Sequence, residues 1–232
     1  RAIGDPLWPD YGYDKEWIEK KKKEVGSRVW SALYQQRPSS PEGALIKRDW
    51  IKYYNRPPSN FDQIIQSWDC SFKDEAASKS GNPDYVVGQV WGRKDANKYL
   101  LDQIRAKMDF PSTIKAVEAM ASKWPHARAK YIEDKANGPA IIATLRNRIS
   151  GLIPVNPEGG KVARVQAITP EFEAGNVYIP APNLANWIQD YIEELVTFPN
   201  AKNDDQVDST SQALLKLGGN RTRTFRRKPT GW

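Results

Sequence analysis

The chain contains one cysteine, Cys70, and one histidine, His126, among 232 residues. A lone cysteine cannot form an internal disulfide, and the two residues together cannot supply the nitrogen and sulfur ligands of a usual zinc site. These absences exclude a disulfide-rich secreted domain and a zinc-finger-type fold. They lead us to expect a protein of a reducing compartment such as a cytoplasm.

Long apolar runs, a signal-peptide pattern and a phosphate loop of the form G-x-x-x-x-G-K-[ST] are also missing. Without the first two, we expect no membrane span and no secretion. Without the third, we expect no ATPase activity in this chain. The sequence begins at Arg1 rather than at methionine, which indicates a fragment or a processed product of something longer.

Charge is what the sequence has in abundance. It carries 35 Lys and Arg against 28 Asp and Glu, for a net charge of +7. A basic chain that keeps many carboxylates fits a nucleic-acid partner, and it equally fits an ordinary basic soluble protein. The positions of the carboxylates are therefore more informative than the net charge.

The pattern of the sequence changes twice along the chain. Residues 1–62 combine a helical segment with a turn-rich, aromatic stretch, and we interpret them as a connector or the end of a preceding domain. Residues 63–218 alternate between strand-like and helical patterns, as in an α/β domain. Residues 219–232 form a basic tail with glycine and proline, which we expect to be disordered when nothing is bound.

The segment 63–218 predicts a mixed β-sheet flanked by helices. The expected strands are "QIIQSWDCSF", "DYVVGQVWGR", "KYLLDQIRAK", "ARAKYIED", "GLIPV" and "GNVYIP", and the expected helices are 111–124, "AIIATLRNRI", "NLANWIQDYIEELVTF" and 204–217. We interpret "NPEGGKVARVQAI" (156–168) as a Gly-rich, basic link. Hairpins make the first three strands antiparallel, and crossovers then add parallel strands.

Acidic side chains recur at three points of this predicted domain. Asp69 lies in the first strand, Glu133 and Asp134 end the fourth strand, and Asp204, Asp205 and Asp208 open the last helix. Each cluster has an ordinary explanation, namely an exposed edge, a turn or a helix cap. A cap needs only one or two acids, however, and closely spaced like charges destabilise a helix. Since reactive groups of α/β sheets gather where strands end, we expect the three clusters to meet.

Clustered carboxylates repel one another unless a cation lies between them. Mg²⁺ and Mn²⁺ prefer oxygen ligands, and two such ions about 3.5–4 Å apart can drive hydrolysis of a phosphodiester. The sequence therefore predicts a site for Mg²⁺ or Mn²⁺, with two ions expected.

Several motifs, in this order, resemble the C-terminal nuclease region of tailed-phage large terminases. They are "SWDCSF", "YIEDKANGPAII", "GLIPVNPEGGKVAR", "FEAGNVYIP" and "FPNAKNDDQVDSTSQAL". The segment "VWSALYQQRPSSPEGALIKRDW" resembles the stretch that joins the ATPase part of these proteins to the nuclease. The resemblance implies a ribonuclease H-like fold and a metal-dependent DNA endonuclease that cuts concatemeric viral DNA.

The resemblance also implies roles for the strand carboxylates. Asp69 matches the first-strand aspartate that bridges both metal ions. The second carboxylate is Glu133 or Asp134, and we slightly favour Asp134.

For the last helix we rank Asp205 first, then Asp208 and Asp204 as metal ligands. Asp205 and Asp208 lie three residues apart and so share one face of the helix. Phosphate contacts are expected from basic residues beside the acidic motifs, namely Lys135, Lys161, Arg164 and Lys202. Such contacts carry no sequence information and weaken with salt.

The partners that the resemblance implies are double-stranded DNA, the ATPase domain of the same protein, the portal and the small terminase subunit, in the host cytoplasm during virion assembly. Two other hypotheses stay open at this point. One is a non-catalytic docking module that binds the portal or small terminase. The other is a ribonuclease H-like resolvase or transposase with a different DNA substrate.

Overall fold

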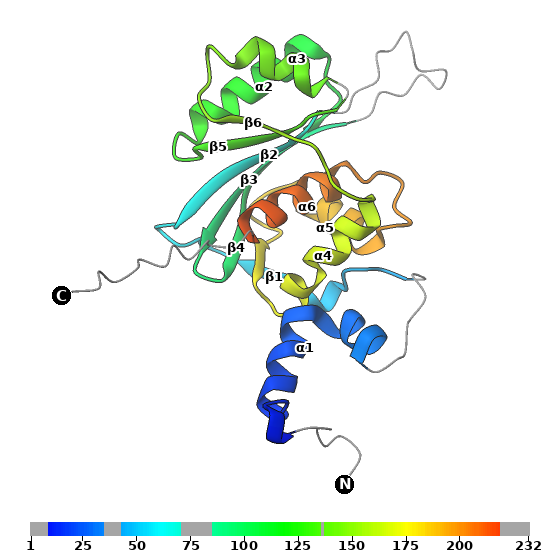
Figure 1. The fold of residues 1–232 in the computed structure, drawn as a ribbon. Helices are drawn as coiled ribbons and strands as arrows, with labels where there is room; N and C mark the ends of the chain where they lie inside the picture. The colour runs from blue at the N-terminus through cyan, green and yellow to red at the C-terminus, as the bar shows by residue number, and fades with distance from the viewer. Residues whose placement is uncertain (1–8, 35–42, 71–84, 136, 219–232) are drawn as a thin grey trace, which may run out of the picture.

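The computed structural model describes residues 9–34, 43–70, 85–135 and 137–218, and the basic tail 219–232 lies outside them. The described residues form a seven-stranded sheet in the order β1-β7-β4-β3-β2-β5-β6 (Figure 1). Its strands are β1 (Lys52–Tyr54), β2 (Gln63–Asp69), β3 (Val86–Lys94), β4 (Asn97–Ala106), β5 (Ala129–Glu133), β6 (Leu152–Val155) and β7 (Val177–Pro180). The predicted α/β class with a mixed sheet is confirmed.

The centre of the sheet is antiparallel and both of its sides are parallel. β2 pairs with β3 and β3 with β4 in antiparallel register. Parallel strands extend the sheet on either side, with β5 on β2 and β6 on β5, and with β7 on β4 and β1 on β7. The tight turn between β3 and β4 places Asp95 at φ 53, the left-handed conformation that short hairpin turns require.

Helices cover both faces of the sheet (Figure 1). They are α1 (Lys15–Val29), α2 (Phe110–Lys123), α3 (Gly138–Leu145), α4 (Lys161–Glu173), α5 (Ile188–Thr197) and α6 (Asp205–Gly218), with short helical turns η1 (Pro9–Tyr11), η2 (Trp30–Tyr34) and η3 (Arg48–Trp50). α2 and α3 lie on one face, α4, α5 and α6 lie on the other, and α1 extends away from the sheet. None of the helices in the described ranges is both long enough and apolar enough to cross a membrane.

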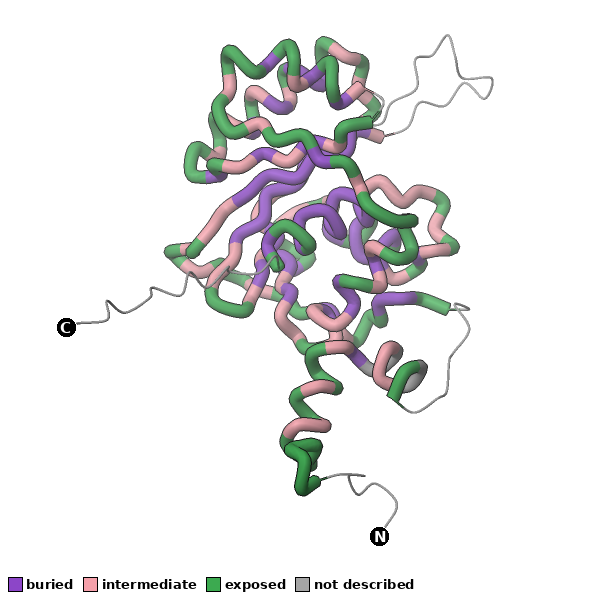
Figure 2. The backbone as a smooth tube through the Cα atoms, in the orientation of Figure 1, coloured by how far each residue is buried: buried purple, intermediate pink, exposed green. Residues whose placement is uncertain are grey.

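Each face of the sheet has its own hydrophobic core, and β2 contributes to both. Trp68 packs with residues of α2 and α3, whereas Ile65 packs with residues of α4, α5 and α6. Successive side chains of a strand point to opposite faces, so Ser67 and Asp69 share the face of Ile65. Figure 2 shows the central strands and α6 as the most continuously buried parts of the chain. The backbone of β2 therefore directs Asp69 toward α6.

Hydrogen bonds dock α6 onto this face. Ser67 Oγ donates to the Ser209 carbonyl (2.8 Å), and Ser209 Oγ donates back to the Ser67 carbonyl (3.0 Å). Gln212 Nε2 donates to Ser67 Oγ (2.9 Å), and Gln89 Nε2 on β3 donates to the Gln206 carbonyl (3.2 Å). All five residues are buried, so each of these bonds satisfies a group that water cannot reach. The network fixes where α6 lies along β2.

The predicted link 156–168 is wrong for most of its length, because α4 begins at Lys161. Gly159 takes the left-handed conformation (φ 73) and Gly160 is the N-cap, so the glycines end a short loop. Val165, Ile168 and Phe172 then lie at helical spacing and are buried against the sheet.

The segment predicted as a connector also contributes to the sheet. β1 pairs in parallel with β7, and Ile46, Ile51 and Leu45 belong to the core on the α4–α6 side. The Leu45 backbone N–H donates to the Phe198 carbonyl (3.4 Å). The division of the chain at residue 62 stays a prediction.

The packing of β3 against β2 yields a test of the fold. A Cβ placed on Gly88 would lie 2.5 Å from the ring of Trp68, which is fully buried. We expect Gly88→Ala to lower the free energy of unfolding by about 1–3 kcal/mol, since overpacking forces side chains from their preferred rotamers. Urea unfolding measures the change. Gly218→Ala at the end of α6 is the matched control, since a Cβ there meets its nearest atom at 3.8 Å, an ordinary contact, and equal stability of the two variants would contradict the packing described.

Candidate active site

Charged side chains from β2, β5, α4 and α6 surround one cavity of about 390 Å³. It is lined by Asp69, Glu133, Lys135, Gly159, Gly160, Lys161, Arg164, Lys202, Asn203, Asp204, Asp205 and Asp208. Five of these are acids and four are bases. The three acidic clusters predicted to meet thus do so, except for Asp134.

The pairing of β2 with β5 explains how the first two acids meet. The strands are parallel, and Trp68 lies opposite Ile132. Asp69 and Glu133 each follow these partners and end their strands, so both reach the same edge of the sheet. Asp69 is only 4% exposed, whereas Glu133 is half-buried at the cavity wall.

Asp134 lies elsewhere. It is exposed, it does not line the cavity, and its backbone N–H donates to the Val155 carbonyl of β6 (2.7 Å). Adjacent residues at the end of a strand point in opposite directions, so only one of the pair can face the cavity. The structure places Glu133 there, although we favoured Asp134, and which of the two binds a metal ion stays a prediction.

Two basic residues of α4 pair with Asp204, which directly precedes α6, and with Asp208 in its first turn. Lys161 Nζ lies 2.7 Å from Asp204 Oδ1 and 2.8 Å from Asp208 Oδ2. Arg164 Nη2 lies 2.6 Å from Asp208 Oδ1, and both side chains of this second pair are at most 10% exposed. Lys161 and Arg164, predicted to contact DNA, therefore face the carboxylates in this structure.

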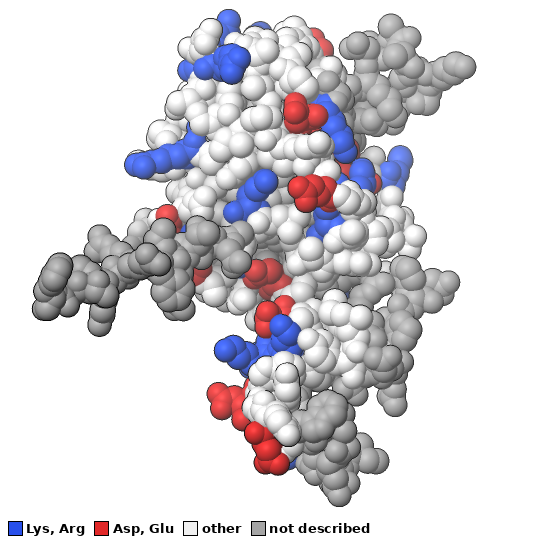
Figure 3. Space-filling view, viewed as in Figure 1, with Lys and Arg blue, Asp and Glu red and all other residues white. Residues whose placement is uncertain are grey.

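The other two predicted DNA contacts are more open to water. Lys135 and Lys202 are both exposed at the rim of the cavity. Lys135 Nζ lies 3.8 Å from Glu133 Oε1, a weak surface pair. On the face of the molecule that Figure 3 shows, basic side chains are scattered among acidic and uncharged ones. Surface charge on that face therefore does not by itself mark a path for DNA.

Crowding of the acids changes their protonation. Burial raises the pKa of Asp205 to about 7, and the negative charges of Asp69, Glu194 and Asp204 add to this rise. Burial, with the charge of Asp208, also raises the pKa of Glu133. A cation placed between these groups would reverse the effect, because it favours the ionised form.

The pKa of Lys161 is also raised, which in a base favours the charged form. Burial disfavours its charged form, but hydrogen bonds and charges from Asp204 and Asp208 outweigh burial and raise the pKa of the amine. Lys161 is therefore held as a cation between the two carboxylates.

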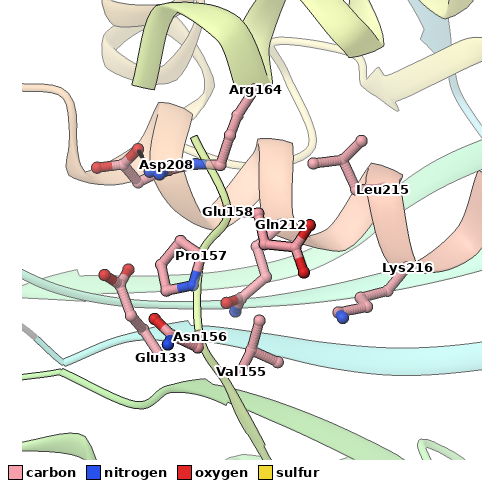
Figure 4. Close-up of a pocket in the computed structure, with 10 residues that line it drawn as sticks. All are labelled: Glu133, Val155, Asn156, Pro157, Glu158, Arg164, Asp208, Gln212, Leu215 and Lys216. Atoms are coloured by element: carbon pink, nitrogen blue, oxygen red, sulfur yellow. Dashed lines mark hydrogen bonds and ion pairs between the residues drawn. The ribbon is translucent and has the colours of Figure 1, made fainter. Parts of the chain in front are cut away.

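A second cavity of about 240 Å³ adjoins the first and shares Glu133, Arg164 and Asp208 with it. In Figure 4, Arg164 reaches down from α4 to Asp208 on α6, and Glu133 lies across from them. This second cavity continues along α6 to Gln212 and Lys216. The carboxylates thus lie at one end of a longer depression.

The donor set fits a hard divalent cation, since its ligating atoms are carboxylate oxygens from three segments. Among the described residues, however, no three Asp, Glu, His or Cys side chains are arranged to hold one metal ion together. Lys161 and Arg164 also engage oxygens of Asp204 and Asp208 that a metal would need.

Sequence reasoning missed two residues beside the site. Glu194 on α5 accepts hydrogen bonds from the first turn of α6, and Arg105 on β4 pairs with Glu194 at 3.2 Å. Glu194 looks like one more acid of an amphipathic helix, and Arg105 like a solvated base. The one signal available was that α6 begins with more aspartates than its own cap requires.

Comparison with known proteins places this arrangement in a family. The family model described as the terminase RNaseH-like domain matches residues 66–217, which is more than half of the chain. A search of curated proteins gave no significant match.

Solved structures share the fold at low sequence identity. The large terminase of one thermophilic bacteriophage is 10% identical with a TM-score of 0.63, over 88% of this chain and 52% of that one. The large terminase nuclease of the thermophilic phage G20c is 15% identical with bound magnesium (TM-score 0.55, 75% of this chain, 97% of that one) and 16% identical with bound zinc (TM-score 0.52, 73% and 92%).

At these identities the structures show a common fold, and this chain spans about half the length of the first of these large terminases. The ribonuclease H-like architecture that the sequence motifs implied is confirmed by the family match and by these neighbours. The chain belongs to the family of terminase RNaseH-like domains.

Proposed function

We propose that this chain is the nuclease of a viral DNA-packaging motor, a metal-dependent endonuclease that cuts concatemeric double-stranded phage DNA. The observation that carries the proposal is the meeting of Asp69, Glu133 and the aspartates of α6 at one cavity. The family supports it, and so do the G20c nuclease structures, which were solved with magnesium, zinc and cobalt bound.

In this proposal Asp69, Glu133, Asp205 and Asp208 hold two Mg²⁺ or Mn²⁺ ions. When bound, such ions supply Lewis-acid activation of a water and of the phosphodiester. Asp69 is suited to the central position because it is buried between the strand and helix clusters. We take Glu133 rather than Asp134 as the second ligand, since only Glu133 lines the cavity.

The bases of the cavity have a role in the same proposal. Lys161 and Arg164 hold the carboxylates of Asp204 and Asp208 while no substrate is present, and each can turn to a phosphate oxygen when DNA binds. Lys135 and Lys202 at the rim contact the DNA backbone further out.

Membership of the family supports a proposal for the partners and for the division of the chain. We propose that residues 63–218 are the nuclease domain, that 1–62 connect it to the ATPase domain of the same protein, and that 219–232 form a basic tail. We also propose that the portal and the small terminase subunit are its partners, and that it acts in the host cytoplasm during virion assembly.

The first test removes the charge of Asp69. We expect Asp69→Asn to reduce Mn²⁺-dependent nicking of supercoiled plasmid by at least about 100-fold, the upper end of what outer groups of a metal site cost. Circular dichroism confirms that the variant is folded. Asp190→Asn, an exposed acid of α5, is the matched control and is expected to cut as wild type. Normal nicking by Asp69→Asn would remove this residue from the site.

The second test compares two neighbouring acids. We expect Glu133→Gln to lose nicking activity, because its carboxylate lines the cavity, and Asp134→Asn to keep it, because that side chain is exposed. Each substitution removes one charge from the same strand end, so the general electrostatic effect is matched. The reverse result would restore Asp134 as the second ligand.

The third test follows pH in metal-free protein. A raised pKa means that the folded state holds the Asp205 proton more tightly than the unfolded chain, so this contribution to stability is lost as pH rises from about 4 toward about 7. Asp205→Asn removes the titration. We expect it to match wild type near pH 4 and to be more stable by about 1–2 kcal/mol at pH 8, a value reduced for the partial exposure of this carboxyl.

Urea unfolding in EDTA at both pH values measures this difference. A gap between Asp205→Asn and wild type that does not grow with pH would show that the Asp205 carboxyl is not crowded in the folded state.

A further inference from the structure

The start of α6 is capped by a residue of another helix. The first backbone N–H groups of a helix have no partner within it, and an Asp at the start normally accepts from them. Here Asp204 and Asp208 pair with Lys161 instead. Glu194 on α5 supplies the cap, with Oε1 at 2.7 Å from the Gln206 N–H and 3.3 Å from the Val207 N–H.

The second carboxylate oxygen of Glu194 also has two polar partners. Glu194 Oε2 accepts from Gln206 Nε2 at 2.7 Å and forms an ion pair with Arg105 Nη2 at 3.2 Å. The guanidinium of Arg105 lies 3.9 Å above the ring centre of Tyr85. The side chain of Glu194 is only 6% exposed, so these are charge-assisted bonds shielded from water.

The two N–H groups that Glu194 accepts from lie between Asp205 and Asp208 in the chain. Their bonds therefore fix the backbone turn that carries both aspartates. Because Glu194 does the capping, none of the three aspartates is needed to cap Gln206 and Val207, and all three line the cavity.

We propose that Glu194, supported by Arg105, is a positioning residue that holds the first turn of α6 so that Asp205 and Asp208 line the same cavity as Asp69, where a metal ion could draw them together. The proposal rests on the proposed function, since it assigns Glu194 to that metal centre. It places Glu194 outside the ligand set, because both of its carboxylate oxygens are engaged by α6 and Arg105.

Mn²⁺ binding to the metal-free full chain, followed by the electron paramagnetic resonance signal of free Mn²⁺, tests the proposal without any cleavage assay. We expect Glu194→Ala to weaken Mn²⁺ binding about 10- to 100-fold, as loss of an outer support of metal ligands does. Glu193→Ala is the matched control, since Glu193 is the adjacent acid of α5, is exposed and pairs with Arg48. Its Mn²⁺ affinity is expected to stay at the wild-type value.

Glu194→Gln separates positioning from charge. It loses the same charge as Glu194→Ala but keeps an oxygen that accepts from the Gln206 and Val207 N–H groups. Tighter Mn²⁺ binding by Glu194→Gln than by Glu194→Ala supports positioning, and equal binding by the two overturns it. Wild-type protein that binds no Mn²⁺ would overturn the metal centre itself, which is a separate result.

Thermal unfolding checks that each variant is folded at the temperature of the assay. Should Glu194→Ala not fold, Glu194→Asp takes its place, because it keeps the charge and shortens the reach to α6. Weaker Mn²⁺ binding by Glu194→Asp than by wild type then supports the proposal, and unchanged binding overturns it.

Discussion

The docking of α6 on β2 through polar contacts is the constraint on which the site depends. The reciprocal bonds of Ser67 and Ser209 connect one strand backbone to one helix backbone at a single register. A purely apolar contact would tolerate sliding, whereas a slip here would leave buried hydroxyl, amide and carbonyl groups without partners, each costing about 1–3 kcal/mol. Since Asp69 is two residues after Ser67, and Asp208 directly precedes Ser209, the same register sets the separation of the acids.

The arrangement of charged side chains at the cavity depends on that register. Acids come from β2, β5 and the start of α6, and bases come from α4, so four segments far apart in sequence meet at one cavity. Removing one member of a buried ion pair leaves an uncompensated charge, which is more costly than the pair is stabilising. This explains why a chain with a net charge of +7 keeps so many carboxylates in one place: local pairing, rather than the overall balance, decides whether they are tolerated.

How much of this the sequence predicts depends on how local the determining interaction is. The strand-forming runs of β2, β3 and β4 and the turn at Asp95 are local features, and the antiparallel centre was predicted correctly. α4 was missed because Gly159 and Gly160 suggested a loop while the buried spacing of its apolar residues began just after them. The choice between Glu133 and Asp134 needed the register of β5 on β2, and Glu194 needed the packing of α5 on α6, neither of which periodicity reveals.

The excess of aspartates at the start of α6 now has a structural explanation. A helix that capped itself would engage one of these carboxylates in its own first turn. With Glu194 in that role, the positive end of the helix still favours nearby negative charge, while none of the three aspartates is needed to satisfy the Gln206 and Val207 N–H groups. The cost is that burial, together with the charges of neighbouring acids, raises the pKa of Asp205 to about 7. Glu194 of the neighbouring helix α5 and the partly buried Arg105 hold this acid-rich turn in place. The geometry of the site therefore depends on the packing of the whole domain and not on the aspartate-rich segment alone.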